Sequence, residues 1–315
     1  MRVITSAEID RVLTFPTLID ALADAFRSEV VTPVRHHHEI ERSGAHGTLL
    51  LMPAWTGSAM ADGFLGVKIV TVFPDNGAKN LPSVLGTYLL MDGATGAPLA
   101  GLDGTRLTAW RTAAASALAA RFLARKDASR MVMVGAGALA PFLIRAHTSQ
   151  RPIREVSLWN HRPERAESVA AELRAEGLPV TAVTDLEQAV RQADIVSCAT
   201  LSSDPIVKGA WLKPGAHLDL VGAFNLNMRE SDDEAVRRSE VYIDTQAAKS
   251  EGGDVALALQ GGAIPESHVK GDLFDLCRKP VARSDEAITL FKSVGTALED
   301  LAAAMLVWRA LPQSS

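Results

Sequence analysis

The feature that most constrains the fold is a glycine-rich turn directly after an apolar run, in the segment MVMVGAGALAPFLIRAH at residues 131–147. Gly135 permits a sharp turn, Gly137 lets a pyrophosphate approach the backbone, and Ala140 still allows a helix to pack closely on a strand. Pro141 fits the first turn of a helix, where free N–H groups face an anion. This spacing is typical of the strand–turn–helix unit that binds dinucleotides.

A glycine turn can also be an ordinary connection between a strand and a helix, so its surroundings decide between the two interpretations. Helices are predicted at 163–176 and at 185–192, the second capped by Asp185. They alternate with predicted strands at 131–134, 155–159, 194–199, 217–221 and 241–244. This alternation predicts a parallel, doubly wound sheet, which is the context that the dinucleotide interpretation requires.

The N-terminal part has a different pattern of predicted elements, with one helix followed by hairpins. We expect one helix over residues 6–28, with Ser6 as its N-cap and with Leu18, Leu22 and Phe26 on its buried face. Residues 34–103 contain short apolar runs separated by turn signals, which are typical of hairpins. These elements predict an α+β domain with a mixed or antiparallel sheet.

Two further helices complete the expected fold. An alanine-rich helix is predicted at 105–125, and a long helix near 285–311 closes the chain and can return to the N-terminal domain. The predicted class is therefore α/β, with a Rossmann doubly wound sheet inserted into an α+β domain.

Composition and charge narrow the class of protein. The 315 residues include 47% apolar and 22% charged residues, which is ordinary for a globular protein. A net charge of −5 with dispersed basic residues is not a nucleic-acid footprint. No apolar run has the length of a membrane span, the N-terminus lacks the pattern of a signal peptide, and Cys198 is expected to be a core side chain. We therefore expect a cytoplasmic protein that binds neither nucleic acid nor membrane.

The end of the second Rossmann strand predicts which dinucleotide is bound. NAD sites usually place a carboxylate there for the ribose 2′-hydroxyl, whereas this chain has Asn160, His161 and Arg162. A neutral Asn160 does not repel a 2′-phosphate, and Arg162 could pair with one through two donors. NADPH is favoured, and NADH remains possible. Alternatively, Arg162 and Arg165 are solvated residues at the start of the next helix and bind no phosphate. This alternative suits Arg165 better than Arg162.

Two cations lie in apolar surroundings. Lys68 shares a strand face with Gly66 and Val70, so it either reaches solvent at an edge or serves a buried anion, and without other evidence the first is narrowly favoured. Arg111 lies near the start of the alanine-rich helix, where a positive charge is unfavourable unless an anion is present. Thr112 could donate to the same region or to a cofactor phosphate.

A run of three histidines, His36–His38, invites a metal interpretation. In a strand at most His36 and His38 share a side, and no cysteine pair, HxxxH spacing or carboxylate cluster supplies further ligands. A solvated strand is the better account, and no metal is expected.

The chain resembles the ornithine cyclodeaminase/mu-crystallin family over nearly its whole length. The resemblance rests on these blocks in this order: PVR, LLMPAW, GVKIVTVF, LTAWRTAAASALAARFLA, VGAGALA, SLWNHRPERAESVA, LKPGAHLDLVGA, RESDDE at residues 229–234, GDV and FKSVGTALEDLAAA. It implies a homodimer, with residues 1–112 plus 296–315 as the substrate-binding and dimerisation domain and 113–295 as the NAD(P)-binding domain.

The resemblance also implies site residues. Arg35, Lys68 and Arg111 match the family positions that bind the carboxylate of a small amino-acid-like substrate, and Lys68 is the expected catalytic group. The expected cofactor site comprises Thr112, Gly135, Gly137, Ala138, Leu139, Asn160, His161, Arg162, Ala199, Thr200, Val221 and Gly222.

Two departures predict the reaction. Phe224 stands where ornithine cyclodeaminases carry an aspartate, and Asn160 stands where they carry an acidic residue. Both departures are similar to family members that reduce cyclic α-imino acids with NADPH, giving L-proline or L-pipecolate. An alanine-type amino-acid dehydrogenase, an ornithine cyclodeaminase and a binding protein without turnover remain alternatives. Asp219 cannot be placed from the sequence.

Overall fold

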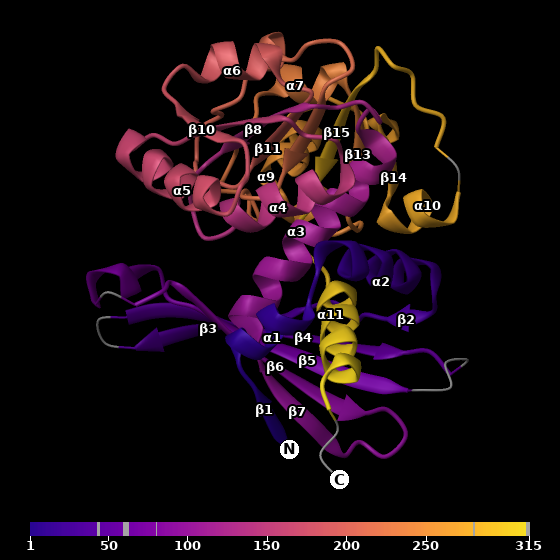
Figure 1. The fold of residues 1–315 in the computed structure, drawn as a ribbon. Helices are drawn as coiled ribbons and strands as arrows, with labels where there is room; N and C mark the ends of the chain where they lie inside the picture. Colours follow the sequence, from indigo (N-terminus) through magenta and orange to yellow (C-terminus); the bar gives the residue numbers. More distant parts are fainter. Residues whose placement is uncertain (43–44, 59–62, 80, 280, 313–315) are drawn as a thin grey trace. The chain divides into compact units, whose positions relative to one another are not determined.

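The computed structural model describes residues 1–42, 45–58, 63–79, 81–279 and 281–312. The chain divides into two compact units, one formed by Met1–Thr112 with Thr296–Ser315 and the other by Ala113–Gly295. Each unit contains a β-sheet of its own, and the figures show how the elements lie within each unit (Figure 1).

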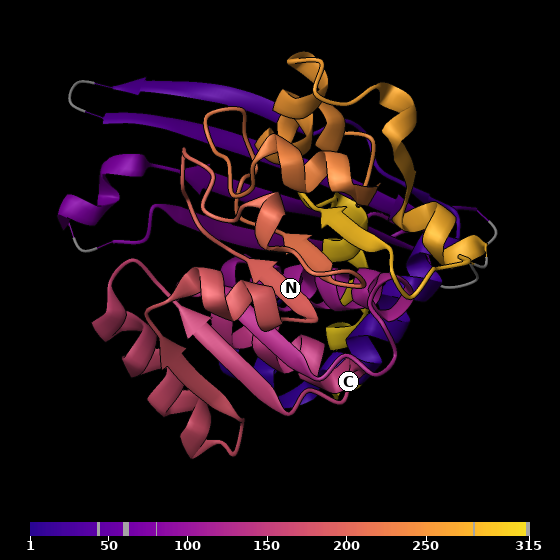
Figure 2. The same cartoon turned by 90° about the horizontal axis from the view of Figure 1, so that it is seen from above.

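The first unit is built on a seven-stranded mixed sheet. Its order is β1-β7-β6-β5-β4-β2, and β3 also pairs with β4. Strand β1 runs parallel to β7, whereas the other pairs are antiparallel, as the predicted hairpins require. Figure 2 shows the long strands lying side by side. The strands are β1 (Arg2–Ile4), β2 (Val30–Val31), β3 (His36–Arg42), β4 (Ala45–Thr56), β5 (Phe64–Val72), β6 (Val84–Asp92) and β7 (Pro98–Asp103).

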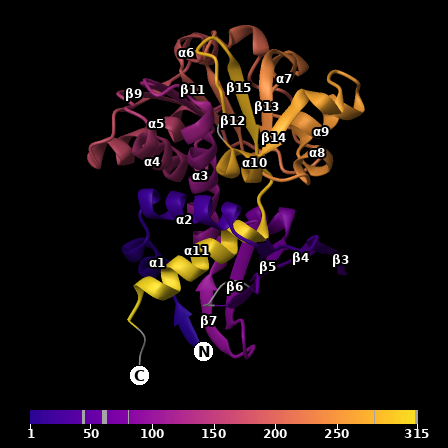
Figure 3. The same cartoon turned by 90° about the vertical axis from the view of Figure 1, so that its right-hand side faces the viewer.

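One face of this sheet is buried under helices. Helix α11 (Ala297–Ala310) packs on β4, β5 and β6, and α2 (Phe15–Arg27) packs on α11 (Figure 3). Burial alternates along β5, since Phe64, Gly66, Lys68 and Val70 are buried whereas the residues between them are half-buried. The sheet therefore has an enclosed face, which carries Lys68, and an opposite apolar face that is not covered by any helix in the described part of this unit.

The predicted helix at 6–28 is two helices. Helix α1 (Ser6–Val12) is capped by Thr5 through a capping box with Glu8, so the expected N-cap at Ser6 is wrong by one residue. A second cap, Thr14, then starts α2. Pro16 lacks an N–H and favours a new first turn over a continuing helix, which explains the break. The expected apolar face is confirmed, because Leu18, Leu22 and Phe26 are fully buried in α2.

The second unit has an eight-stranded parallel sheet, which confirms the predicted Rossmann architecture. Its order is β10-β9-β8-β11-β12-β15-β13-β14. Helices α6 (Leu186–Gln192), α7 (Asp233–Arg238) and α9 (Gly253–Gln260) pack with the strands in one core. His147 of α4 (Ala140–Gln150) bonds to Asp219 on the opposite face of β12. The strands are β8 (Arg130–Val134), β9 (Glu155–Trp159), β10 (Val180–Val183), β11 (Ile195–Cys198), β12 (His217–Leu220), β13 (Ser239–Ile243), β14 (Val269–Asp272) and β15 (Ile288–Lys292).

The predicted closing helix at 285–311 is wrong over its first half. Residues Ile288–Lys292 form β15, which pairs with β12 and β13 in the middle of the sheet. All five residues are buried, so the strand lacks the alternation that would distinguish it from a buried helix. Gly295 then adopts a φ of 80°, and Thr296 caps α11. The sequence interpretation also missed β10 and β14.

The remaining α-helices complete the two units, and none in the described ranges is long and apolar enough to cross a bilayer. Asp185 caps α6 as predicted. The helices are α3 (Gly104–Leu123), α4 (Ala140–Gln150), α5 (Pro163–Ala175), α6 (Leu186–Gln192), α7 (Asp233–Arg238), α8 (Ala248–Glu251), α9 (Gly253–Gln260) and α10 (Leu273–Arg278).

Candidate functional site

Lys68 lies in the middle of the enclosed face of the first sheet. It pairs with Met52 of β4 and with Tyr88 of β6, and its side chain points toward α11. The residue is 2% exposed, so it does not reach solvent at an edge. Its Nζ lies 2.7 Å from Oδ2 of Asp300, a fully buried carboxylate in the first turn of α11.

Arg111 of α3 meets the same turn of α11. Its Nη1 donates to Oε2 of Glu299 at 2.6 Å, and its Nε donates to Oδ1 of Asp300 at 3.1 Å. Asp300 therefore contacts both cations. The structure brings together the two cations that looked out of place in the sequence, and it pairs them with two carboxylates that keep them charged.

The electrostatics of this cluster suit a group that exchanges a proton. Burial and the nearby Arg111 lower the pKa of Lys68 to about 8, although Asp300 and Glu299 act in the opposite direction. Lys68 can thus be an ammonium ion that attracts a carboxylate, and it can lose a proton close to neutral pH.

Three members of the cluster were missed by sequence reasoning. Glu299 and Asp300 are adjacent acids in a helix that is apolar apart from them and Arg309, which is a signal that the sequence does contain. Acids in the first turn of a helix are favoured by its dipole, so the pair also suits the helix itself. Tyr88 gave no signal. Burial and Asp300 raise the pKa of Tyr88 well above its usual value, and its hydroxyl has no hydrogen-bond partner in the described part of the chain.

Arg35 lies on a separate segment, half-buried and directly before β3. The histidines that follow it are exposed on β3, and the rings of His36 and His38 are 6.4 Å apart, on the same side as alternation predicts. In the ranges that the structure describes, no group of three or more His, Cys, Asp or Glu residues could hold a metal ion.

The glycine turn has the geometry expected for a dinucleotide. Gly135 adopts a φ of 102°, and a Cβ there would lie 2.7 Å from the carbonyl oxygen of Ala199, so only glycine fits. A Cβ on Gly137 would meet no atom within 4 Å, which leaves this backbone accessible. Ala138 and Leu139 lead into α4, whose N-terminus has no side-chain cap. An anion can therefore bind the free N–H groups of that helix.

The other expected cofactor residues lie at the same edge of the sheet. Ala199 and Thr200 follow β11, and Val221 and Gly222 follow β12, while β8 is the neighbour of β11. Ligands of doubly wound sheets bind outside the carboxyl ends of the strands, so these residues fit a dinucleotide. Thr112 belongs to the first unit, where it is buried.

The polar side chains after β9 are of two kinds: some are held by hydrogen bonds to the backbone, and others are exposed and can meet a ligand. Asn160 shapes the turn, because its Oδ1 accepts from the N–H of Ala136 at 3.3 Å and its Nδ2 donates to the carbonyl of Arg162 at 3.2 Å. Arg165 donates to the carbonyl of Ala136 at 3.2 Å. His161 and Arg162 are exposed. Arg162 is thus the cation at this turn that is best placed to meet a phosphate.

The segment after β12 is where a deaminating member of the family would need an acidic residue. Phe224 is 40% exposed in this segment. Asp219, which the sequence could not place, is fully buried: it accepts from Oγ of Ser197 at 2.6 Å and bonds to Nε2 of His147 at 3.2 Å. Despite burial, the hydrogen bonds with His147 and Ser197 lower the pKa of Asp219. Asp219 therefore ties β11, β12 and α4 together and is not available as a base.

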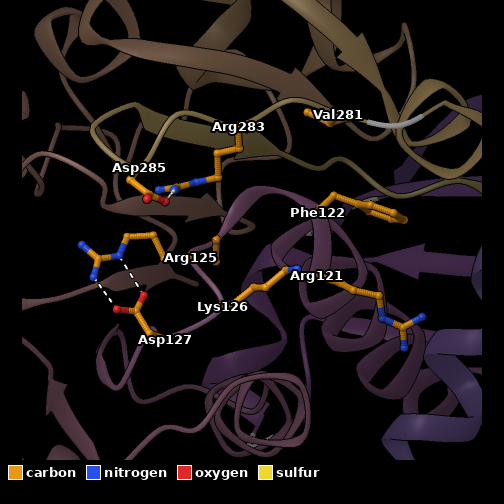
Figure 4. A pocket seen from close by; sticks show the side chains of 9 residues that line it. Arg121, Phe122, Arg125, Lys126, Asp127, Val281, Arg283 and Asp285 are labelled. Carbon is orange, nitrogen blue, oxygen red and sulfur yellow. Dashed lines mark hydrogen bonds and ion pairs between the residues drawn. The ribbon is translucent and has the colours of Figure 1, made fainter.

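A hollow of about 480 Å³ lies elsewhere in the second unit, at the end of α3 (Figure 4). It is rich in arginine, but these side chains already have partners: Arg125 pairs with Asp127, and Arg283 donates to the carbonyls of Leu123 and Gly215. Carbonyls at the C-terminus of a helix attract cations and repel anions. Arg283 thus completes the end of α3 while Arg125 is paired with an acid, and this hollow is a poor site for a dinucleotide.

Comparison with known proteins agrees with this arrangement. A family model described as the ornithine cyclodeaminase/mu-crystallin family matches residues 1–314. The chain is 38% identical over 291 residues to a Δ1-pyrroline-2-carboxylate reductase of Paracoccus denitrificans, covering 90% of this chain and 92% of the relative.

Two solved structures share the whole fold. One is Thermococcus litoralis Δ1-pyrroline-2-carboxylate reductase in complex with NADH and L-proline, with a TM-score of 0.92, 33% identity, and coverage of 98% of this chain and 97% of that one. The other is an archaeal alanine dehydrogenase dimer with bound NAD, with a TM-score of 0.88, 29% identity, and coverage of 98% and 95%.

Proposed function

The chain belongs to the ornithine cyclodeaminase/mu-crystallin family, and on that premise we propose that it is a nicotinamide-dependent oxidoreductase that reduces cyclic α-imino acids. The substrates are Δ1-pyrroline-2-carboxylate, which gives L-proline, and Δ1-piperideine-2-carboxylate, which gives L-pipecolate. The observation that carries this proposal is the buried cluster in which Asp300 contacts both Lys68 and Arg111. The similarity to two pyrroline-2-carboxylate reductases supports the same class of substrate.

The cations of the first unit bind the substrate. Lys68 and Arg111 attract the carboxylate of the imino acid, and Arg35 contributes a third positive charge. Glu299 and Asp300 fix the direction of both buried cations, so that less side-chain freedom is lost when the substrate binds. Removing such cations from a desolvated site is costly, because a charge-assisted hydrogen bond is worth about 1.5–3 kcal/mol.

Lys68 is also the proton donor in this proposal. When bound, a reduced nicotinamide supplies the hydride that the imine carbon accepts. The C=N bond becomes a C–N single bond, and the imine nitrogen needs one proton. With a pKa of about 8, the Lys68 ammonium is mostly protonated at neutral pH and is acidic enough to give that proton.

We further propose that NADPH is preferred over NADH. Asn160 is neutral and is held by the backbone around it, so it places no carboxylate near a 2′-phosphate. Arg162 is exposed beside it and offers a planar pair of donors. NADH remains usable, since the glycine turn contacts only the pyrophosphate that both cofactors share.

The functional protein is a homodimer in this proposal. On the uncovered face of the first sheet, Leu65, Val67 and Ile69 of β5 are only half-buried, and Leu85 of β6 is exposed. An apolar sheet face of this kind is unfavourable in water and is suited to a second apolar surface. A second copy of the chain is the partner that the dimeric state of the alanine dehydrogenase relative supports.

An amino-acid dehydrogenase acting on a keto acid and ammonia is the second candidate, favoured by the similarity to alanine dehydrogenase. Oxidative deamination needs a group that activates water. Phe224 cannot activate water, and Asp219 is buried among its own partners. The cyclic imine contains the C=N bond already, so its reduction does not need this group.

Transfer of a label tests the proposed reaction. The protein is incubated with NADPH carrying deuterium at both positions of C4 and with Δ1-pyrroline-2-carboxylate, and the proline formed is analysed by NMR. We expect deuterium at the α-carbon and only the L-enantiomer. A protein that only binds these molecules gives no proline, and proline without deuterium at that carbon contradicts hydride transfer.

A further inference from the structure

Glu230 joins the two backbone turns that follow β11 and β12. Its Oε1 accepts from the N–H of Thr200 at 2.6 Å and from the Thr200 hydroxyl at 2.9 Å. Its Oε2 accepts from the N–H of Gly222 at 2.7 Å and from that of Ala223 at 3.3 Å. Glu230 is fully buried, so no solvent competes for these donors. One carboxylate thus sets the positions of two turns at the proposed cofactor edge.

The backbone of Glu230 is fixed from both sides. Its N–H donates to Oδ1 of Asp254 at 2.8 Å, and its carbonyl accepts from the N–H groups of Ile206 and Val207, each at 2.9 Å. The other oxygen of Asp254 lies 3.1 Å from Nζ of Lys292. These bonds hold the main chain at Glu230 in place. A change in the charge of its carboxyl group therefore acts on the two turns that are hydrogen-bonded to it.

The donors around Glu230 require a carboxylate. Three of them are backbone N–H groups, which cannot reverse their role. A protonated Oε2 would place its O–H against the N–H of Gly222, and a protonated Oε1 would require the Thr200 hydroxyl to turn and accept from it. In either case the backbone N–H groups lose the negative charge to which they donate. Nothing bulkier than glycine fits at position 222 either, because a Cβ there would lie 2.5 Å from Oε1 of Glu230.

Few charged groups face Glu230. Asp254 of α9 and Lys292 of β15 are both fully buried beside it, and Cys198 of β11 is a buried thiol whose pKa is raised by burial and by Glu230. Burial raises the pKa of Glu230 to about 7; Lys292 lowers it and Asp254 raises it further. The carboxyl group is therefore ionised above neutral pH and becomes neutral below it.

We propose that Glu230 is a positioning residue whose negative charge holds the turns at Thr200 and Gly222 in the shape that binds a dinucleotide, so that dinucleotide binding weakens as Glu230 is neutralised. This inference rests on the proposed function, because it takes the carboxyl edge of the second sheet as the cofactor site. The inference predicts that dinucleotide binding depends on pH through Glu230, which lies outside the glycine turn.

Titration of the full-length protein with NADH tests the proposal without turnover. NADH is the probe because it lacks a 2′-phosphate, which would itself titrate near pH 6. We expect the Kd of the wild type to rise about tenfold between pH 8 and pH 6, which corresponds to the loss of one charge-assisted hydrogen bond. Glu230→Gln should bind weakly with a Kd that does not depend on pH. The control Glu172→Gln, an exposed position on α5, should behave as the wild type.

Hydrogen exchange in the NADH-free protein gives a second readout. Corrected for intrinsic rates, the amides of Thr200 and Gly222 should lose protection in the wild type at pH 6 and in Glu230→Gln at pH 8. The wild-type profiles decide the question even if the variant does not fold. If the wild type binds NADH with a Kd that does not change with pH, the inference about Glu230 is wrong, whereas the proposed cofactor site still stands. Failure to bind NADH at any pH, with normal protection of both amides, overturns the proposed cofactor site and the inference with it.

Discussion

Nζ of Lys68 and Oδ2 of Asp300 lie 2.7 Å apart, on a strand and a helix that are separated by more than two hundred residues of sequence. Asp300 also accepts from Nε of Arg111 at 3.1 Å. One buried carboxylate thus controls both the charge of the proposed proton donor and the direction of the neighbouring arginine. Breaking this relationship should change the pH dependence of the enzyme as well as its rate.

We expect Asp300→Asn to move the alkaline limb of the pH profile. In the wild type, kcat/KM for the imine should fall as pH rises through about 8, because Lys68 is protonated below its pKa and neutral above it. Loss of Asp300 removes a contribution that raises this pKa, so the limb should move to lower pH. At neutral pH, kcat/KM should fall about ten- to a hundredfold.

Glu299→Gln is the matched control, because Glu299 bonds to Arg111 and only weakly affects Lys68. It should lower kcat/KM with a smaller shift of the limb, and both variants should keep the KM for NADPH within about twofold. The substrate is the same in every profile, so its own ionisation cancels in the comparison. An alkaline limb that stays in place in Asp300→Asn contradicts this role of Asp300.

A charge on the uncovered face of the first sheet should prevent dimerisation. Val67 is half-buried on this face of β5, and Val67→Lys would place an ammonium group in the proposed interface. Light scattering at micromolar concentration should give a dimer mass for the wild type and a monomer mass for the variant. Gln188→Lys, at an exposed position on α6, adds the same charge and should stay dimeric. A monomeric wild type would refute the dimer.

The fold was largely predictable because its signals are local. The glycine turn at Gly135 and the alternation of strands and helices around it predicted the parallel sheet, which the structure confirms. The errors also have local causes. Strand β15 is buried on both faces and has no alternation, and Thr14 with Pro16 divides a continuous apolar pattern into two helices.

The candidate site was only half predictable. Lys68 and Arg111 attracted attention because a buried charge needs a reason. Their partners Glu299 and Asp300 lie 188 and 189 residues from Arg111, so no local spacing relates them. Glu230 lies in the block RESDDE that supports the resemblance, but its role was missed for a similar reason: that role depends on two turns that meet only after β11 and β12 pair in the sheet.

Arg162→Ala tests the choice of cofactor. The KM for NADPH should rise about tenfold, because the variant loses one charge-assisted hydrogen bond to the 2′-phosphate. The KM for NADH, which has no such phosphate, should be nearly unchanged. Arg165→Ala is the comparison, because Arg165 holds the carbonyl of Ala136 and should affect both cofactors alike. Equal weakening of both cofactors by Arg162→Ala would show that Arg162 does not recognise the 2′-phosphate.

We expect no ornithine cyclodeaminase activity. That reaction needs proton transfers at an amine, for which general acid–base help contributes about 10²–10⁴-fold. Phe224 can neither give nor take a proton, and Asp219 is fully buried with Ser197 and His147. The protein is incubated with L-ornithine and NAD⁺ or NADP⁺, and ammonia and proline are assayed. Steady formation of both products would show that another residue does the work of the missing aspartate.

The central claim is reduction of a cyclic imine, and the initial rate of NADPH oxidation at 340 nm tests it most directly. The rate is measured with Δ1-pyrroline-2-carboxylate, with Δ1-piperideine-2-carboxylate, and with pyruvate plus ammonium. We predict saturable oxidation with at least one cyclic imine, a kcat/KM far above that for pyruvate plus ammonium, and a loss of about ten- to a hundredfold in Lys68→Ala. No oxidation with either imine, or faster oxidation with pyruvate and ammonium, would contradict the account.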